Sequence, residues 1–457
     1  MNSNLYGKDM YNYHIPEKSL WELTQCGNNL EVSTMNGDHN IEVAVIGGGY
    51  TGLSAAYHLA KDYGLEVAII EAGHIGWGAS GRNGGFCSIG GTAESSKNLI
   101  SKYGLEDVRH YYQSQVEAVE LVKNIIESEQ IDIQIQGNAE IEVANSQKNL
   151  DEMIEHASFQ RKRLGLNTTV ITKEELAENF FDANEQWGGI AVQPTFGIQP
   201  LRYAKGLASA AIKNGVKIFT HSEIISWEKN NEKHILSSKE GKLTARYVVF
   251  ATNGFMPEHL SNNFKSRSLP IISSIITTRP LSQIELDAHN WQTDNPVINS
   301  RKLVNYYRLL PDKRFLFGGR GSSSGDKIGA ESNYKYLINV MRNIWPNWSD
   351  VEIECKWHGF VCFTRRLTPS IGRLEDDASV FFGFGYHGNG VNTSTWAGWK
   401  LAHWLGKNSK NTKLQSDLPL LVQGLSPKFP LASLRRHYLQ GVIQLYRLKD
   451  AIKFKLN

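Results

Sequence analysis

The first strong pattern in the chain is an apolar run at residues 41–46, followed by glycines, an Ala- and Leu-rich stretch to residue 63 and a second apolar run at 67–70. Short apolar runs bounded by turn residues are typical of buried strands, and the spacing of apolar residues between them predicts a helix. Strand, helix and strand in this order form a βαβ unit with parallel strands. The pattern therefore predicts the start of a doubly wound α/β lobe.

Later segments predict a second lobe and then a return to the first. Residues 108–126 carry apolar residues at helical spacing, and residues 131–143 alternate as in a strand. A helix is predicted from residue 200 to residue 213, and strands are predicted at 216–219, 247–251 and 380–384. The last two strands run into glycine-containing loops. Ligands of open α/β sheets bind at such carboxyl ends.

Composition narrows the class of protein. The 457 residues are 41% hydrophobic and 21% charged, as expected for a globular chain of two or three domains or one two-lobed unit. No apolar run is long enough to span a bilayer, no signal-peptide pattern is present, and a net charge of +3 argues against nucleic-acid binding. The cysteines form no CxxC pair, which argues against a disulfide framework or a metal site and favours the reducing cytoplasm. They are Cys26, Cys87, Cys355 and Cys362.

The C-terminal end is more basic than the rest of the chain. Residues 426–457 hold seven Lys and Arg residues and one acid, Asp450, so that this tail carries a charge of +6. The segment has a helical pattern in which Leu434, Tyr438, Val442, Leu445 and Ile452 lie on one side. Such a helix either docks on the protein's own surface or attaches weakly to an anionic membrane.

A dinucleotide-binding fingerprint follows the first strand. Gly47, Gly49 and Gly52 match GxGxxG at the head of the predicted helix. These glycines permit a tight turn, close approach of a pyrophosphate and close packing of helix on strand. Glu71 ends the second strand, 19 residues after Gly52, where a carboxylate accepts hydrogen bonds from an adenosine ribose. The alternative is a glycine-rich turn that binds no ligand.

A second glycine-rich segment favours a flavin over a nicotinamide. Residues 76–85 contain five glycines in ten positions, which suits a cradle for the ribityl chain and ring of FAD. With this segment the chain resembles the FAD-dependent oxidoreductases of the D-amino-acid oxidase (DAO) superfamily, and within them the gamma-glutamylputrescine oxidases. The resemblance covers about residues 41–455 and rests on residues 47–52 with Glu71, 78–85 (GASGRNGG), 251–254 (ATNG), 306–319 (YYRLLPDKRFLFGG), 357–359 with 368–369, and 388–391 (GNGV).

The resemblance implies a Rossmann-like FAD-binding domain of the DAO and glutathione-reductase type, interleaved with an α+β, sheet-based substrate-binding domain. The FAD-binding domain would comprise residues 41–100, 186–262 and 351–412. Residues 101–185 and 263–350 would bind the substrate, leaving an N-terminal extension (1–40) and the basic tail (413–457). The cofactor-binding positions it implies are Gly47, Gly49, Tyr50, Thr51, Gly52, Glu71, Ala72, Gly78, Ala79, Ser80, Arg82, Asn83, Gly84, Gly85, Glu223, Ile224, Ala251, Thr252, Gly254, Gly388, Asn389, Gly390 and Val391.

The implied reaction is the oxidation of a small-molecule amine by FAD, with oxygen as electron acceptor, which requires the protein to position a neutral amine. Candidates for the substrate pocket are Tyr306, Tyr307, Arg308, Trp357, His387 and Asn392. On one strand, Tyr306 and Tyr307 face opposite sides, so that at least one belongs to the core. Trp357 is also suited to packing, His387 to a solvated loop and Arg308 to holding a neighbouring loop.

Three positions depart from relatives in this superfamily. Sarcosine oxidases bind the substrate carboxylate with a lysine where this chain has Asn392, so that a substrate α-carboxylate is not expected. Their oxygen-activating lysine is matched here by Leu316. A covalent FAD link through cysteine would need the position of Phe363 rather than Cys362, which favours non-covalent FAD. Three functions therefore stay open: an amine oxidase, an amine or N-methyl amino acid dehydrogenase with another acceptor, and a redox-inert FAD-binding partner subunit.

Overall fold

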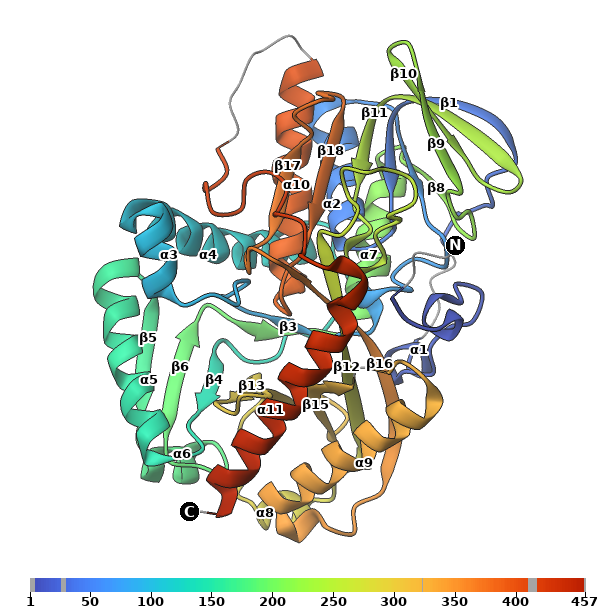
Figure 1. The fold of residues 1–457 in the computed structure, drawn as a ribbon. Coiled ribbons are helices and arrows are strands. Elements are labelled where there is room, and N and C mark those ends of the chain that lie inside the picture. The colour runs from blue at the N-terminus through green and yellow to red at the C-terminus, as the bar shows by residue number, and fades with distance from the viewer. Residues whose placement is uncertain (1–4, 26–29, 323, 410–416, 456–457) are drawn as a thin grey trace.

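The computed structural model describes residues 5–25, 30–322, 324–409 and 417–455, with the side chains of 321–322, 408–409 and 447–455 left aside. Cys26 and Ile452, named above, lie outside these described positions or side chains. The described residues form two large sheets, one above the other in Figure 1. This arrangement confirms the predicted α/β class with a second, sheet-based lobe.

The first sheet has the order β17-β18-β11-β1-β2-β8, with β9 and β10 continuing from β11. Its central pairs, β1 with β11 and β2, β2 with β8, and β11 with β18, are parallel, as the βαβ pattern predicts. The strands are β1 (Gly37–Ile46), β2 (Val67–Ile70), β8 (Lys217–Phe219), β9 (Ser226–Asn230), β10 (Lys233–Ser237), β11 (Gly241–Phe250), β17 (Ser370–Arg373) and β18 (Val380–Phe384).

Helices cover this sheet with their apolar sides. Helix α2 (Tyr50–Tyr63) packs against α7 (Pro200–Lys213) and α10 (Gly390–Ser409), and α10 also contacts α4 (Leu105–Ser128). Helix α7 begins as its sequence predicts, with Pro200 in the first turn and the Gln199 side chain accepting from the Arg202 N–H at 2.7 Å. The apolar stripes of these helices and the strands β1 and β2 share one buried core.

The second sheet is mixed and has the order β16-β12-β15-β14-β13-β4-β6-β5. Helix α9 (Lys327–Ile344) packs on one face over β12 and β15, around a cluster of tryptophans and phenylalanines. The strands are β4 (Glu140–Val143), β5 (Asn167–Ile171), β6 (Gly189–Gln193), β12 (Ser268–Pro280), β13 (Val297–Asn299), β14 (Asn305–Leu309), β15 (Arg314–Ser322) and β16 (Ile353–Thr364). The remaining α-helices and strands are α1 (Leu20–Leu23), α3 (Ser96–Tyr103), α5 (Gln147–Phe159), α6 (Lys173–Asn179), α8 (Gln283–Asp287), α11 (Arg435–Lys455) and the short pair β3 (Phe86–Cys87) and β7 (Phe196–Gly197).

Three segments of the structure differ from the domain and strand boundaries that are expected from the sequence. Strand β16 pairs with β12 along its length and therefore belongs to the second sheet, although the resemblance implies that residues 351–412 belong to the FAD-binding domain. Strand β6 likewise pairs with β4 and β5 in the second sheet, although it lies within 186–262, which the resemblance also gives to the FAD-binding domain. Strand β1 begins at Gly37, inside the expected extension, because its first residues pair with β11. Residues 131–139 form no long strand; β4 begins only at Glu140.

The C-terminal helix α11 runs across β12 in the front of the molecule (Figure 1). It docks through Leu439 and Ile443, which are buried, and through Arg435, which donates to Glu258 at 2.9 Å. The stripe expected to dock is exposed instead, with Leu434 at 46% and Leu445 at 49% exposure. None of the helices in the described part of the chain is both long and apolar enough to cross a membrane.

Candidate cofactor and substrate site

A single cavity of about 600 Å³ runs from the carboxyl ends of β1, β2 and β11 to one face of the second sheet. Its first half is lined by the glycine turn, by the 78–84 loop and by the residues after β11. Its second half is lined by side chains of β4, β12, β13, β14, β15 and β16. The two predicted halves of the protein, cofactor-binding and substrate-binding, therefore meet in one space.

The glycine turn needs residues without side chains. Gly47 has a φ of 112°, and a Cβ on it would lie 2.8 Å from the carbonyl oxygen of Ala251. A Cβ on Gly52 would collide with the carbonyl oxygen of Gly47. The turn thus packs directly on the end of β11 and on α2, and only its backbone borders the cavity. This leaves room for a pyrophosphate at the N-terminus of α2.

Glu71 lies at the end of β2, in the cavity wall. Its Oε2 accepts the Gly48 N–H at 2.6 Å, and its Oε1 accepts the Gly73 N–H at 2.7 Å. Burial raises the pKa of Glu71, and the two backbone N–H groups oppose that rise. Each carboxylate oxygen keeps a further lone pair for a ligand hydroxyl, so that Glu71 fits the ribose of a dinucleotide. Glu223, Ile224 and Ala72 line the same end.

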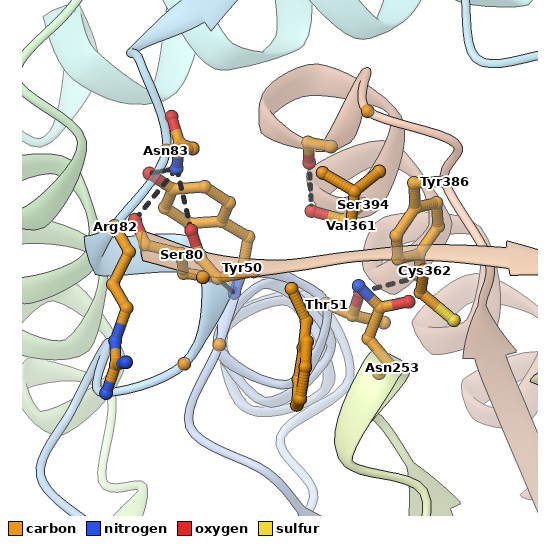
Figure 2. A pocket seen from close by; sticks show the side chains of 18 of the residues that line it. Tyr50, Thr51, Ser80, Arg82, Asn83, Asn253, Val361, Cys362, Tyr386 and Ser394 are labelled. Carbon is orange, nitrogen blue, oxygen red and sulfur yellow. Dashed lines mark hydrogen bonds between the residues drawn. The ribbon is translucent and has the colours of Figure 1, made fainter. Parts of the chain in front are cut away.

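The 78–84 loop is held in shape by its own side chains, as Figure 2 shows. Ser80 accepts the backbone N–H of Tyr50 at 3.0 Å, which ties the loop to the start of α2. Asn83 donates to the carbonyl oxygens of Ala79 and Ser80, at 3.0 and 3.1 Å, and accepts the Gly85 N–H at 2.8 Å. These hydrogen bonds fix the backbone of the loop along the cavity wall. Gly85 itself does not line the cavity.

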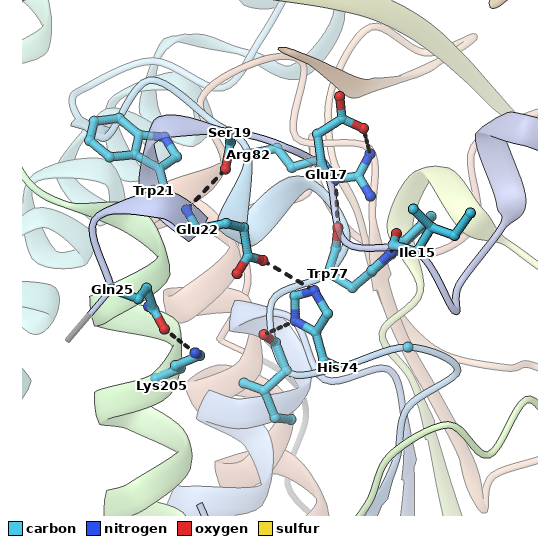
Figure 3. A network of polar contacts seen from close by, with 12 residues as sticks. Ile15, Glu17, Ser19, Trp21, Glu22, Gln25, His74, Trp77, Arg82 and Lys205 are labelled. Carbon is cyan, nitrogen blue, oxygen red and sulfur yellow. Dashed lines mark hydrogen bonds and ion pairs between the residues drawn. The ribbon is translucent and has the colours of Figure 1, made fainter. Parts of the chain in front are cut away.

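The N-terminal segment (residues 5–25, called here the N-terminal strap) braces this loop from behind (Figure 3). Glu17 pairs with Arg82 at 3.2 Å, and the indole N–H of Trp21 donates to the carbonyl oxygen of Asn83 at 2.8 Å. The guanidinium of Arg82 also stacks on Trp77, 4.2 Å from its ring centre. The expected surface extension is therefore part of the cofactor half, and the charge of Arg82 is balanced by the strap.

The loop before α10 closes the cavity on the opposite side. Gly388, Asn389, Gly390 and Val391 line it, as the resemblance implies for the pyrimidine edge of a flavin. Asn389 is fixed by Ser88, whose hydroxyl donates to Asn389 Oδ1 at 3.0 Å. The N-terminus of α10 supplies free N–H groups and positive potential here, which would stabilise negative charge on the reduced ring of a bound flavin.

His387 lies in this loop and lines the cavity. Burial, with a smaller contribution from the neighbouring Arg320 cation, lowers the pKa of His387 to about 3. Its Nε2 lies 3.4 Å from Thr364 Oγ1, and its backbone carbonyl accepts from Arg320 at 3.1 Å. His387 is thus neutral near pH 7, which suits it to orient a ring or a substrate rather than to carry charge.

Two of the residues expected in the substrate pocket lie elsewhere. Tyr307 faces the aromatic core beside Trp345, with ring centres 4.8 Å apart, because it stands on the opposite side of β14 from Tyr306. Trp357 is buried and donates its indole N–H to the carbonyl oxygen of Arg82 at 2.8 Å. Neither lines the cavity. Trp357 supports the cofactor loop instead.

Arg308 is also not at the cavity but behind its wall. Its guanidinium donates to the carbonyl oxygens of Gly84 and Ile198, at 3.0 and 2.5 Å, and to Gln136 Oε1 at 2.8 Å. Burial lowers the pKa of Arg308 to about 9. These contacts give it the loop-holding role that the sequence left open. Asn392 is buried beside the cavity lining, and neither of its amide atoms has a hydrogen-bond partner among the described residues.

The sequence named Tyr306 and His387 as candidates but missed most of the other side chains that line the substrate half. Arg320, Glu140, Ser273 and Val361 line it together with Tyr306, whose hydroxyl lies 3.0 Å from Ser273 Oγ. Two signals were present: an arginine between glycines at the end of an apolar strand, and acidic residues at 140 and 142 alternating with Ile141 and Val143. Charged residues that repeat with period two occupy one face of a strand.

The residues of the cofactor half fit FAD. The glycines leave space where a Cβ would intrude, Glu71 is placed for a ribose, and a second cradle of loops at 78–84 and 387–391 continues the groove. Burial raises the pKa of Cys362 to about 12, so that this cavity-lining thiol stays protonated and is a poor nucleophile. The fit is that of a non-covalently held cofactor.

Comparisons with known proteins agree with this geometry. The sequence profile of the family described as "DAO: FAD dependent oxidoreductase" matches residues 42–404. The chain is 29% identical to the gamma-glutamylputrescine oxidoreductase of Escherichia coli over 84% of this chain and 88% of that protein. It is 28% identical to a probable oxidoreductase, OrdL, of Haemophilus influenzae over 78% of this chain and 81% of the relative. The structure of glycine oxidase from Geobacillus kaustophilus superposes with a TM-score of 0.69 at 21% identity, covering 86% of this chain and all of the other.

The family match over residues 42–404 confirms what the glycine motifs predict: the chain belongs to the DAO family of FAD-dependent oxidoreductases.

Proposed function

We propose that this enzyme oxidises the C–N bond of a small polar amine resembling gamma-glutamylputrescine and passes the electrons to oxygen. The observation that best supports this proposal is the continuous cavity, in which the loop at 387–391 directly adjoins a polar face of the second sheet. The name of the E. coli relative supports the choice of amine. The same residues would also accept other amines of that size and polarity.

The overall reaction consumes the amine, oxygen and water and yields an aldehyde, ammonia and hydrogen peroxide; a secondary amine would release an amine instead of ammonia. When bound, FAD supplies the hydride acceptor, taking two electrons and one hydrogen from the carbon next to nitrogen. The proton on nitrogen goes to solvent, and water hydrolyses the resulting imine. Oxygen takes the two electrons and two protons and leaves as peroxide.

The protein's own groups position the amine. Burial raises the pKa of Tyr306 to about 12, so that its phenol stays protonated and is held by Ser273. His387 stays neutral for the reason given above, and it places no positive charge against the amine. Both groups can hold a neutral amine nitrogen by hydrogen bonds, which is the protonation state that hydride transfer requires.

A dehydrogenase that uses another electron acceptor is the second candidate. It is favoured by Leu316, which is fully buried in an apolar cluster with Trp357 and Ile275 at the place that, by the resemblance, corresponds to the oxygen-activating lysine of sarcosine oxidases. No lysine is found among the cavity-lining residues in the described ranges. Oxygen would then react slowly with the reduced enzyme.

Anaerobic mixing with a panel of amines and amino acids tests both proposals. We expect gamma-glutamylputrescine to bleach the flavin absorbance, and admission of air to restore it with one peroxide per reduced flavin. Bleaching without recovery in air, but with turnover on a dye acceptor, would replace the oxidase by the dehydrogenase. Tightly bound flavin that no amine reduces would favour the redox-inert subunit.

A further inference from the structure

The substrate half of the cavity is one face of the second sheet, and its charges are unevenly placed. In the register of the strands, Arg320 on β15 lies directly opposite Ser273 on β12. Tyr306 on β14, Ile298 on β13 and Glu142 on β4 likewise lie opposite one another in a single row across the sheet. Residues that are directly opposite on neighbouring strands point to the same side of a sheet. This face therefore carries a cation on β15 and two carboxyl groups on β4.

Arg320 is a cation without a matching anion. Its guanidinium donates to the carbonyl oxygen of His387 at 3.1 Å and lies 5.2 Å from the ring centre of Phe363. No carboxylate pairs with it within the part of the chain described here. Burial lowers the pKa of Arg320, and an anionic ligand group would offset that loss of solvation. An arginine fork in a cavity matches a carboxylate in geometry as well as in charge.

Glu140 and Glu142 form the opposite pole. They project from the same side of β4, Glu140 lines the cavity, and neither forms an ion pair among the described residues. Burial, and secondly the charge of Glu142, raise the pKa of Glu140 to about 8. Burial raises the pKa of Glu142 to about 7. A positively charged ligand group would offset both the burial and the mutual repulsion.

Both poles reach the loop at the flavin side. Arg320 contacts it through His387, and Glu140 reaches it through Ser88, which holds Asn389. In sheet order, β14 and β13 separate β15 from β4, which places the two strands about 14 Å apart at the usual strand spacing. The residues between the poles, Tyr306, Ile298 and Val304, are not charged.

We propose that Arg320 and the Glu140–Glu142 pair are the specificity residues of this site. Arg320 binds the carboxylate at one end of an elongated amino acid-like substrate, and the glutamate pair binds the amine at the other end as it arrives in its ammonium form, before it loses a proton to solvent and reacts as the neutral amine. This rests on the proposed function and narrows its substrate class to amines that carry a carboxylate several bonds from the amine. The carboxylate would then bind at Arg320 on β15 and not at Asn392 in helix α10, the position at which the sequence predicts no carboxylate binding. A substrate with one charged end leaves one pole unmatched.

Paired substrates test the Arg320 pole. The rate and concentration dependence of anaerobic flavin reduction would be measured with gamma-glutamylputrescine and with its analogue in which the α-carboxylate is an amide. We expect Arg320→Met to weaken apparent binding of the carboxylate by about 30-fold while leaving the amide unchanged, and Arg320→Lys to restore part of the difference. Arg246→Met, at an exposed arginine on β11, is the matched control and should change neither.

Glu140→Gln and Glu142→Gln test the other pole, because glutamine keeps the shape and hydrogen bonding of the side chain. We expect each to weaken binding of the cationic substrate by about 10-fold with little change in the limiting reduction rate. Titration with glutarate, followed by the shift in flavin absorbance, gives a readout without turnover. Glutarate should bind the wild type and the two glutamine variants but not Arg320→Met.

The outcomes separate this inference from the proposed function. If no amine reduces the flavin, the proposed function fails, and the glutarate titration still decides whether Arg320 binds carboxylates. If amines reduce the flavin but the carboxylate and its amide behave alike in the wild type and in Arg320→Met, the two-pole site is wrong while the amine oxidoreductase stands. Glutarate binding to Arg320→Met with unchanged affinity would also overturn it.

Discussion

The two halves of the cavity are built from different parts of the chain. In the cofactor half the wall is formed by glycine-containing loops, whose backbone is held in place by side chains such as Asn83 that hydrogen-bond within the loop. In the substrate half the ligand-facing groups are side chains from strands β4, β12, β14 and β15, which span residues 140–322. The comparison teaches that a site made from contiguous backbone leaves a motif in the sequence, while a site made from one sheet face leaves only scattered single residues.

The largest expected effect lies in the backbone half. Gly52→Ala places a Cβ against the carbonyl oxygen of Gly47, where neither the turn nor α2 can shift without losing the pyrophosphate site. We expect loss of bound FAD and a destabilisation of about 3 to 5 kcal/mol. The ratio of flavin to protein absorbance and the thermal midpoint measure both.

Gly441→Ala is the control for that substitution. Nothing lies within 4 Å of a Cβ at this position of α11, and alanine favours a helix over glycine. Its FAD content should equal that of the wild type. Retention of FAD by Gly52→Ala would show that the turn is less closely packed than the structure indicates.

A substitution at Arg308 tests whether this residue supports the cofactor half of the cavity or binds the substrate. Arg308→Met removes the donor to three acceptors around the cofactor loop, of which Gly84 lies in the cavity wall. Buried acceptors without donors cost about 1 to 3 kcal/mol each, so that we expect a lower thermal midpoint and weaker FAD binding. Among molecules that retain FAD, the preference for a carboxylate over its amide should be unchanged. A selective loss of carboxylate binding would return Arg308 to the substrate site.

The adjacent tyrosines give the sharpest contrast between the halves. Tyr306→Phe removes the hydroxyl that contacts Ser273 in the cavity, whereas Tyr307→Phe removes one in the aromatic core behind the sheet. We expect Tyr306→Phe to weaken amine binding in flavin reduction by about 5- to 10-fold. Tyr307→Phe should leave reduction unchanged, and equal effects of the two would contradict the orientation of β14.

These contrasts explain how far the sequence could lead. The βαβ unit, the glycine turn and Glu71 follow one another within residues 41–71, so that their spacing alone predicted a nucleotide site and its doubly wound sheet. The position of β16 could not be predicted, because its pairing with β12 joins residues about ninety positions apart. Arg320 and Glu140 were missed for the same reason, since only the order of strands brings their side chains to one face.

The last expected effect is a pH dependence of stability that belongs to the substrate half. Because the pKa of Glu140 rises to about 8 on folding, mainly through burial, the folded enzyme binds its proton more tightly than the unfolded chain does. Its contribution to the unfolding free energy therefore falls as pH increases between about 4.5 and 8, by no more than about 1.4 kcal/mol for each unit of pKa difference. Glu140→Gln should remove this slope, so that the variant gains thermal stability over the wild type at pH 8.5 and loses that advantage at pH 5. Melting curves at the two pH values, with and without glutarate as an anion that fills the opposite pole, would measure it, and parallel pH profiles for the two proteins would show that Glu140 is solvated by the cavity rather than buried in it.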